Sequence, residues 1–118
     1  MKYMIMTFGS AAEMVETANM EWIREMIQFM RQIDVDLRES GELVYQQGLA
    51  DSAFAKMVTY SETGDSTVLP VSRSESLIGF WIVDVATEAR AMEIAKQIAK
   101  YAGAVEVRPA LDEPPVAV

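Results

Sequence analysis

The chain of 118 residues has room for one domain with one hydrophobic core, and its composition, 51% hydrophobic and 24% charged, is that of an ordinary globular protein. It contains neither cysteine nor histidine, which excludes disulfides, catalysis by a thiolate or an imidazole, and metal sites built on those ligands. The net charge of −8 disfavours nucleic acid and anionic lipid as partners, because binding to either depends on clustered cations.

No apolar run approaches the roughly 20 residues that a membrane-spanning helix needs. Residues 1–6 are followed by Thr, Phe and Gly rather than by a long apolar stretch and a small-residue cleavage site. We therefore expect a cytoplasmic protein with no membrane association. No acidic cluster has the spacing of a calcium loop, so we expect no metal and no cofactor.

A strand, a long helix and a second strand are predicted first. Residues 2–8 alternate with apolar side chains on both faces, and Gly9 ends the strand. Between residues 20 and 39 apolar side chains recur at intervals of three and four, which predicts an amphipathic helix, with Gly41 at its left-handed C-terminal cap. Residues 43–49 are predicted to form the next strand.

A pair of short strands and a loop come next in the chain. Residues 53–61 alternate as a strand, residues 62–65 have turn chemistry, and residues 67–69 can return as its partner. Pro70 removes a ladder donor, so the residues after it are expected at a sheet edge or in a loop. The polar stretch 72–76 is predicted to be a surface loop.

The strand around which the fold is organised is predicted at residues 79–85. Alternate side chains point to opposite faces, with Phe80 and Ile82 on one face and Trp81 and Val83 on the other. A strand that is apolar on both faces belongs in the middle of a sheet with something packed above and below it.

The second helix is predicted to begin after Thr87, a good N-cap residue, and to end at Gly103. The last strand is predicted at residues 104–108. We therefore expect a single domain over residues 1–109 and a C-terminal tail over residues 110–118.

This order of elements favours an α+β sandwich, in which one largely antiparallel sheet carries both helices on one face. The other face would be left open, and we expect it to be the one that carries Trp81, Val83 and Val85. Burying roughly 300–400 Å² of this strand contributes at most about 5–10 kcal/mol. An exposed apolar patch of that size is unusual in a monomer, so a homodimer through the open sheet face is predicted.

Five short stretches, in this order, resemble the YCII-related proteins, in the branch named for its DGPF motif. They are Lys2-Tyr3-Met4, residues 36–44, Gly48-Leu49, Leu77-Ile-Gly-Phe80 and residues 103–109. The resemblance covers the chain up to about Pro109. It implies a ferredoxin-like βαββαβ fold, association of two copies as a dimeric α/β barrel, and a cleft proposed as an active site in a family whose members mostly have no established reaction.

The chain departs from the family pattern where chemistry is expected. The Asp-Gly-Pro-Phe stretch is expected near residues 67–70, which read Thr-Val-Leu-Pro here. The family's proposed His on the first helix falls near Met30, and this chain has no His. The proposed His-Asp dyad therefore cannot operate. Of the usually acidic segment after the motif, Glu75 remains.

Candidate ligand-binding residues have two interpretations each. Arg73 is either a solvated loop residue or a bidentate partner for a carboxylate or phosphate. Tyr45 and Trp81 either pack in the core or a dimer interface, or stack on a planar ligand. Asp84 has two interpretations. It lies at the strand end, where it is exposed or caps the second helix, or it is a base whose pKa is raised by apolar neighbours. Glu75 is either solvated or part of the same loop site. No catalytic residue is assigned.

Two further patterns lie on or near the first helix. The four methionines there either fill the core or line a soft pocket. They are Met14, Met20, Met26 and Met30. Asp34 and Asp36 are two positions apart, so they do not share a helix face and cannot act as a paired acid and base.

These observations leave three functions open. The first is a degenerate, noncatalytic dimer that binds a small ligand or a partner in a cleft near the 72–76 loop. The alternative is a small-molecule enzyme, isomerase-like or lyase-like, that uses carboxylate or tyrosine acid/base chemistry. The third is an interaction subunit without a ligand.

Overall fold

The computed structural model describes residues 1–10, 19–71 and 75–116. In chain order its elements are β1 (Lys2–Gly9), α2 (Met20–Glu39), β2 (Leu43–Gly48), the 3-10 helix η1 (Ser52–Phe54), β3 (Lys56–Tyr60), β4 (Ser66–Pro70), β5 (Ser76–Asp84), α3 (Glu88–Ala102) and β6 (Val105–Pro109). The predicted helices and strands are present, and their ends differ from the prediction by at most a few residues.

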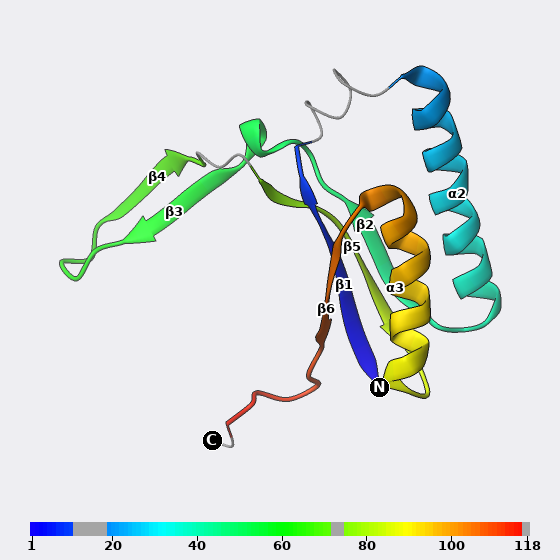
Figure 1. Ribbon diagram of the computed structural model, residues 1–118. Coiled ribbons are helices and arrows are strands. Elements are labelled where there is room, and N and C mark those ends of the chain that lie inside the picture. The colour runs from blue at the N-terminus through cyan, green and yellow to red at the C-terminus, as the bar shows by residue number, and fades with distance from the viewer. Residues whose placement is uncertain (11–18, 72–74, 117–118) are drawn as a thin grey trace.

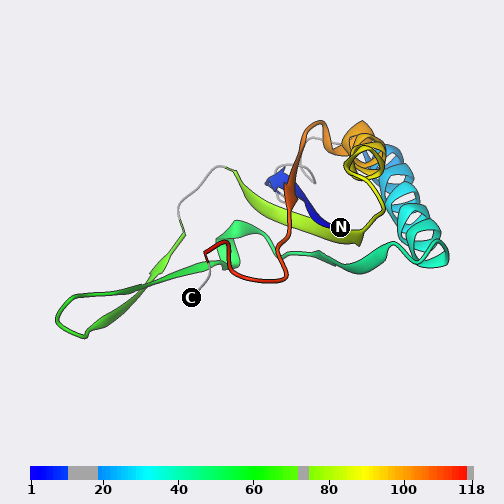
Figure 2. The same cartoon turned by 90° about the horizontal axis from the view of Figure 1, so that it is seen from below.

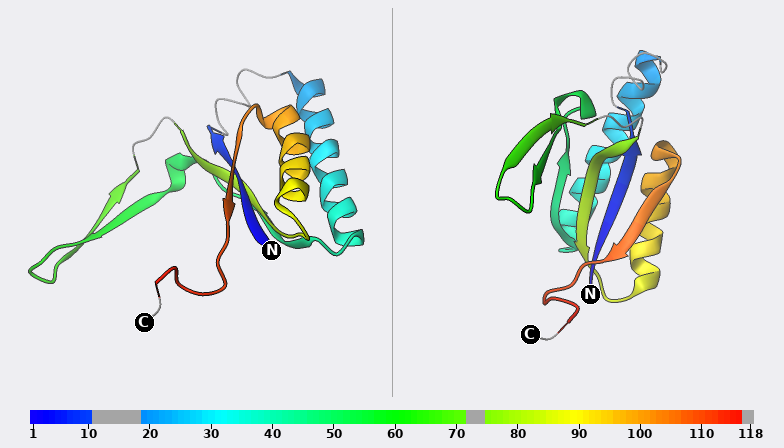
Figure 3. Two further views of the ribbon diagram at one scale, coloured as in Figure 1. Left: turned by 60° about the horizontal axis from the view of Figure 1, so that its bottom comes forward. Right: turned by 90° about the vertical axis from the view of Figure 1, so that its left-hand side faces the viewer.

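The main sheet of the described residues has the strand order β2-β5-β1-β6, and its neighbouring strands are antiparallel. β5 therefore lies inside the sheet, as its two apolar faces predicted. Both helices cover one face of this sheet (Figures 1 and 3). The described chain is thus an α+β structure with a largely antiparallel sheet under a layer of two helices.

Helix α2 has the caps that its sequence predicts. The side chain of Asn19 accepts a hydrogen bond from the backbone N–H of Trp22 at 2.7 Å. At the other end Gly41 has a φ of 76°, and the N–H of Glu42 donates to the carbonyl of Leu37 at 2.9 Å. This is the Schellman arrangement, which needs the left-handed residue that glycine supplies.

Helix α3 has a side-chain N-cap of the same kind and ends at a glycine with a positive φ of 83°. The Thr87 hydroxyl accepts the N–H of Arg90 at 3.2 Å, and the N–H of Gly103 donates to the carbonyl of Ala99 at 2.8 Å. Small residues on its inner face let it approach the sheet closely. Its buried residues are Ala91, Ile94, Ala95 and Ile98.

The core between the helices and the sheet contains the face of β5 that we expected to be open. Trp81, Val83 and Val85 are only 8%, 0% and 4% exposed, so that prediction is wrong. The alternation along a strand separates two apolar faces, but it does not say which one the helices will cover. A buried indole N–H needs an acceptor, and Asp34 on α2 supplies one to Trp81 at 2.8 Å.

The open face of the sheet is therefore the other one. Met4 lies opposite Ile82, and Met6 lies opposite Phe80, in the antiparallel register of β1 and β5. Directly opposite residues share a face, so these four side chains form one apolar surface away from the helices, in which Met6 is only 8% exposed and Met4, Phe80 and Ile82 are half-buried. Tyr45 extends it from β2, with its ring centroid 6.1 Å from that of Phe80.

Strands β3 and β4 form a separate two-stranded sheet that projects from the body (Figures 1 and 2). We expected one sheet, and the difference begins after β2. Asp51 accepts a hydrogen bond from the N–H of Ala53 at 3.0 Å and so caps η1, which turns the chain away from the edge of β2. The predicted turn is present, with Gly64 at a φ of 92°.

The chain beyond β6 stays near the start of β1. The N–H of Ala110 donates to the carbonyl of Lys2 at 2.9 Å, and the rest of the described tail is exposed. Within the described ranges, no helix combines the length and the apolar character needed to cross a membrane.

Candidate functional site

A cavity of about 310 Å³ lies between α2, the last turn of α3 and the strands β2 and β5. Its volume is at the lower end of the range for small-molecule sites. Four side chains of α2 line it at every fourth position, which places them in one row along the helix. They are Trp22, Met26, Met30 and Asp34.

Most of the cavity wall is apolar and aromatic. Trp81 lines it from the sheet and Tyr101 from α3. The ring of Tyr101 lies 5.8 Å from that of Trp22, in a tilted contact that closes the wall between the two helices. Two flexible thioethers, Met26 and Met30, complete this side, so the shape of the cavity is adaptable.

One carboxylate enters this wall. Asp34 is half-buried, and its Oδ1 accepts the indole N–H of Trp81 at 2.8 Å. It is the only charged side chain among the described residues that line the cavity. A carboxylate in an apolar wall attracts a cation or a hydrogen-bond donor and repels an anion.

The strand side of the cavity is shaped by Gly79. A Cβ atom at this position would lie 3.3 Å from Oγ1 of Thr7 and 3.4 Å from the carbonyl oxygen of Gln47. The Thr7 hydroxyl donates to the carbonyl of Gly79 at 3.1 Å, so it is already satisfied. A side chain here would push against both strands that flank β5.

Of the five residues predicted to bind a ligand, Trp81 is the one that lines the cavity. Tyr45 is 53% exposed on the open face, and its hydroxyl donates to Gln47 at 2.9 Å. Asp84 is exposed at the end of β5 and accepts a hydrogen bond from the amino group of Met1 at 2.9 Å. Glu75 is exposed just before β5.

Arg73 and most of the predicted 72–76 loop lie outside the described residues. A second hollow of about 320 Å³ is lined by η1 and by Val71, Ser76 and Leu77, among other described residues. The structure therefore does not bring the five predicted residues together. Of the four that the structure describes, Trp81 lines the cavity, Tyr45 lies on the open sheet face, Asp84 lies at the end of β5 and Glu75 lies just before its start.

Sequence reasoning missed Asp34 as a site residue. It considered this side chain only as a partner for Asp36, which is exposed and accepts a hydrogen bond from Gln32 at 2.8 Å. The available signal was the row Trp22-Met26-Met30-Asp34, in which a carboxylate continues an apolar stripe. Of the two interpretations of the methionines, lining a pocket fits Met26 and Met30, and filling the core also fits Met30, which packs against the buried cluster. Met20 is 62% exposed, and Met14 lies outside the described residues.

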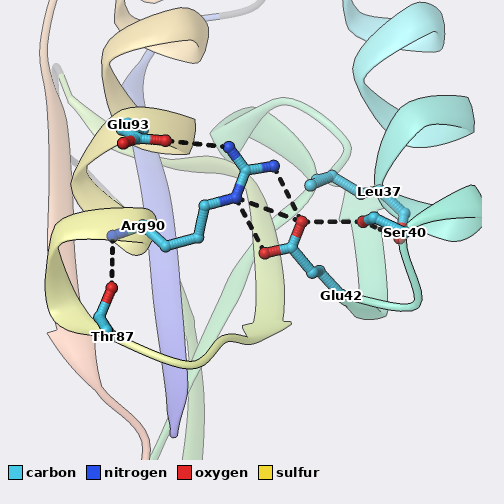
Figure 4. Close-up of polar contacts among 6 residues, drawn as sticks. All are labelled: Leu37, Ser40, Glu42, Thr87, Arg90 and Glu93. Atoms are coloured by element: carbon cyan, nitrogen blue, oxygen red, sulfur yellow. Dashed lines mark hydrogen bonds and ion pairs between the residues drawn. The ribbon is translucent and has the colours of Figure 1, made fainter.

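The strongest ion pair joins the start of β2 to α3 (Figure 4). Arg90 donates from Nε and Nη2 to the carboxylate of Glu42 at 2.8 to 3.2 Å, and from Nη1 to Glu93 at 3.1 Å. These hydrogen bonds hold the pKa of Glu42 below its usual value and raise the pKa of Arg90. Each of the three side-chain nitrogens of Arg90 donates to a carboxylate, so this cluster links the start of β2 to α3 and is occupied by the protein's own anions.

The described ranges contain no group of three or more Asp, Glu, His or Cys side chains placed to hold a metal ion. The fold and the cavity define an α+β protein whose helix layer and sheet enclose a cavity with a mainly apolar wall and one carboxylate. No family model matches the chain, and no curated protein matches it.

Proposed function

We propose that the chain is a noncatalytic small-ligand-binding protein whose site is the cavity between α2 and the sheet. The observation that carries this proposal is a single carboxylate, Asp34, set in a wall of aromatic rings and thioethers. A wall of this kind suits a flat apolar ligand, and the carboxylate suits one that carries an amine or another hydrogen-bond donor.

Electrostatics support the same class of ligand. The net charge of −8 favours the approach of a cation over that of an anion, and Asp34 extends that preference into the cavity. An aromatic amine of one or two rings fits a space of about 310 Å³. The second hollow, lined by η1, Val71, Ser76 and Leu77, has one aromatic residue, Phe54, among its described lining residues.

The test is thermal unfolding in the presence of tryptamine and of indole-3-acetate, which share a ring system and differ in charge. A ligand at 100 times its dissociation constant adds about 2.7 kcal/mol to the stability of the folded state. We expect tryptamine to raise the melting temperature and indole-3-acetate to leave it unchanged.

The matched variants are Asp34→Asn and Asp36→Asn, two positions apart on the same helix. We expect Asp34→Asn to remove the preference for the amine and Asp36→Asn, on the exposed face, to keep it. Equal effects of the two variants, or no stabilisation by either compound, would contradict the assignment of the site.

A second candidate function is an isomerase-like or lyase-like enzyme. It is favoured by one observation, that Asp34 and Tyr101 line the same cavity and can act as base and acid. Mass spectrometry of a bound ligand, before and after incubation with the protein, separates the two functions. Conversion that Asp34→Asn abolishes while binding survives would establish the enzyme; an unchanged ligand supports binding alone.

We further propose that the chain is a YCII-related protein of the DGPF branch with the ferredoxin-like βαββαβ fold. When the β3–β4 hairpin is set aside, the element order is β1-α2-β2-β5-α3-β6, and the sheet order β2-β5-β1-β6 supports this topology. A cytoplasmic location remains our expectation from the sequence, and fractionation of cells that express the chain tests it.

The same proposal includes a homodimer through the open sheet face, in the manner of a dimeric α/β barrel. The apolar surface of Met4, Met6, Phe80 and Ile82 supports it, because no helix of the described chain covers that face. Light scattering at micromolar concentration should give twice the mass of one chain. Phe80→Glu should give monomers, whereas Val35→Glu, an exposed position on α2, should not.

A further inference from the structure

The β3–β4 hairpin is the most exposed apolar element of the described chain. Every residue of both strands is exposed. Val58 lies opposite Val68 on one face of the hairpin, and Met57 lies opposite Leu69 on the other. Their exposed fractions run from 39% to 64%, and Tyr60 beside them reaches 76%.

Such a hairpin is not stable by itself. A two-stranded sheet in water is marginal at best, and its apolar side chains gain nothing unless another surface covers them. The turn is well formed, because the N–H of Ser61 donates to the carbonyl of Asp65 at 2.8 Å. Every residue of the two strands is nevertheless exposed, and no other element of the described ranges covers their apolar side chains. A second chain is the partner considered below.

The direction of the hairpin indicates where that partner lies. The hairpin and the C-terminal segment both project to the side of the main sheet that the helices leave open (Figures 1 and 3). The apolar surface of Met4, Met6, Phe80 and Ile82 belongs to this open face of the sheet. A body that covers the open face therefore also reaches the hairpin.

The amount of surface matches a second copy of the chain. The accessible surface is 8484 Å², whereas a compact monomer of this mass exposes about 6,400 Å². The radius of gyration, 16.9 Å, likewise exceeds the roughly 13.5 Å of a compact domain of this length. The excess of about 2,100 Å² per chain is the area that an obligate dimer buries.

We propose that the β3–β4 hairpin is a dimerisation arm that packs against the open sheet face, and the rim of that face, in a second copy. This inference rests on the homodimer proposed above and adds the element that holds it. A twofold axis makes the contact reciprocal, so each copy receives the arm of the other and both unpartnered surfaces are covered at once.

The charges of the arm favour this occupant over a membrane or nucleic acid. Its turn carries Glu62 and Asp65, which phosphate groups and anionic lipid repel. Lys56 is the only cation in its two strands. The arm is thus an apolar ribbon with an acidic tip, suited to an apolar protein surface.

The absence of cysteine allows a direct test by cross-linking. A Val58→Cys chain with an affinity tag is mixed with an untagged Tyr45→Cys chain and treated with a short bismaleimide. We expect tagged and untagged chains to be joined. The matched control replaces Tyr45→Cys by Val35→Cys on the far side of α2, and we expect no joined product.

A second measurement is sedimentation equilibrium of the double variant Val58→Lys/Val68→Lys. We expect its dimer to dissociate at least tenfold more readily than that of the original chain, while Ile27→Lys, at an exposed position on α2, has no effect. Both positions of the double variant lie outside the core, so its circular dichroism should match that of the original chain.

The outcomes separate the arm from the dimer. A dimer that the double variant leaves intact, or cross-links only between two Val58→Cys chains, overturns the arm and leaves the sheet-to-sheet dimer standing. A monomer at micromolar concentration overturns both. Co-sedimentation with uncharged lipid vesicles, lost in the double variant, assigns the hairpin to a membrane surface and also overturns the proposal.

Discussion

Replacement of Glu42 by Gln tests whether the ion pair between the start of β2 and α3 braces the fold. The substitution removes the charge that Arg90 meets through hydrogen bonds of 2.8 to 3.2 Å, while the side-chain size is kept. The side chain of Glu42 is 17% exposed and that of Arg90 is 36% exposed. Exposed pairs contribute up to about 1 kcal/mol, and breaking buried ones costs about 3–5 kcal/mol. We therefore expect Glu42→Gln to lose about 1–2 kcal/mol at pH 7.

The effect should depend on pH in one direction. Arg90 holds the pKa of Glu42 below its usual value in the folded chain. The ion pair therefore contributes its full share to the free energy of unfolding above the pKa of glutamate in the unfolded chain, about 4.3. That contribution is lost as the pH falls through the lower pKa that Glu42 has in the folded chain. The difference between the original chain and Glu42→Gln should shrink as the pH falls from 7 toward 3.

Urea unfolding followed by circular dichroism at pH 7, 5 and 3 measures this difference directly. Glu93→Gln is the matched control, because Glu93 also pairs with Arg90 but is 64% exposed. It should cost at most about 0.5 kcal/mol. Two results would refute the reasoning. One is a loss of unfolding free energy in Glu42→Gln that is as large at pH 3 as at pH 7, and the other is a loss at pH 7 no larger than that of Glu93→Gln.

Three other substitutions test the cavity and the core, each by urea unfolding at pH 7. Trp81→Phe removes the donor to Asp34 and should cost about 1–2 kcal/mol, since water replaces part of that bond; no loss would show that the bond is not formed in solution. Gly79→Ala places a Cβ 3.3 Å from Oγ1 of Thr7 and should cost about 1 kcal/mol and weaken tryptamine binding. An unchanged affinity would argue against this wall of the cavity. Ile94→Ala, at a residue 1% exposed, should cost about 2–5 kcal/mol, and a loss under 1 kcal/mol would place Ile94 outside the core.

Local signals predicted the elements well because each rests on neighbouring residues. Gly41 and Gly103 mark the ends of the two helices by their positive φ, and the turn at 62–65 joins two strands, as expected. The face of β5 under the helices was predicted wrongly, because its two faces are equally apolar. The choice depended on packing between segments far apart in the sequence, in which Trp81 joins a core with helix residues such as Ile33 and Ile94.

The candidate site was harder to predict than the fold. Tyr45, Glu75 and Asp84 carry plausible chemistry, yet the structure places them on the open face or at strand ends. Asp34 is also a carboxylate, but in the sequence it was considered only as a partner for Asp36, which lies on another face of the helix. Asp34 is a candidate site residue because it lines a cavity with the aromatic rings of Tyr101 on α3 and Trp81 on β5. The spacing of residues along one helix cannot predict contacts with other elements.

The amino-acid sequence by itself determined the chemistry that is excluded, the caps of both helices and the order of the elements, because composition and spacing act over a few residues. Only the tertiary structure decided which face of the sheet the helices cover, where the cavity opens, and that the hairpin leaves the main sheet. Those outcomes depend on contacts between segments far apart in the chain. A local sequence pattern does not determine the free energies of such contacts.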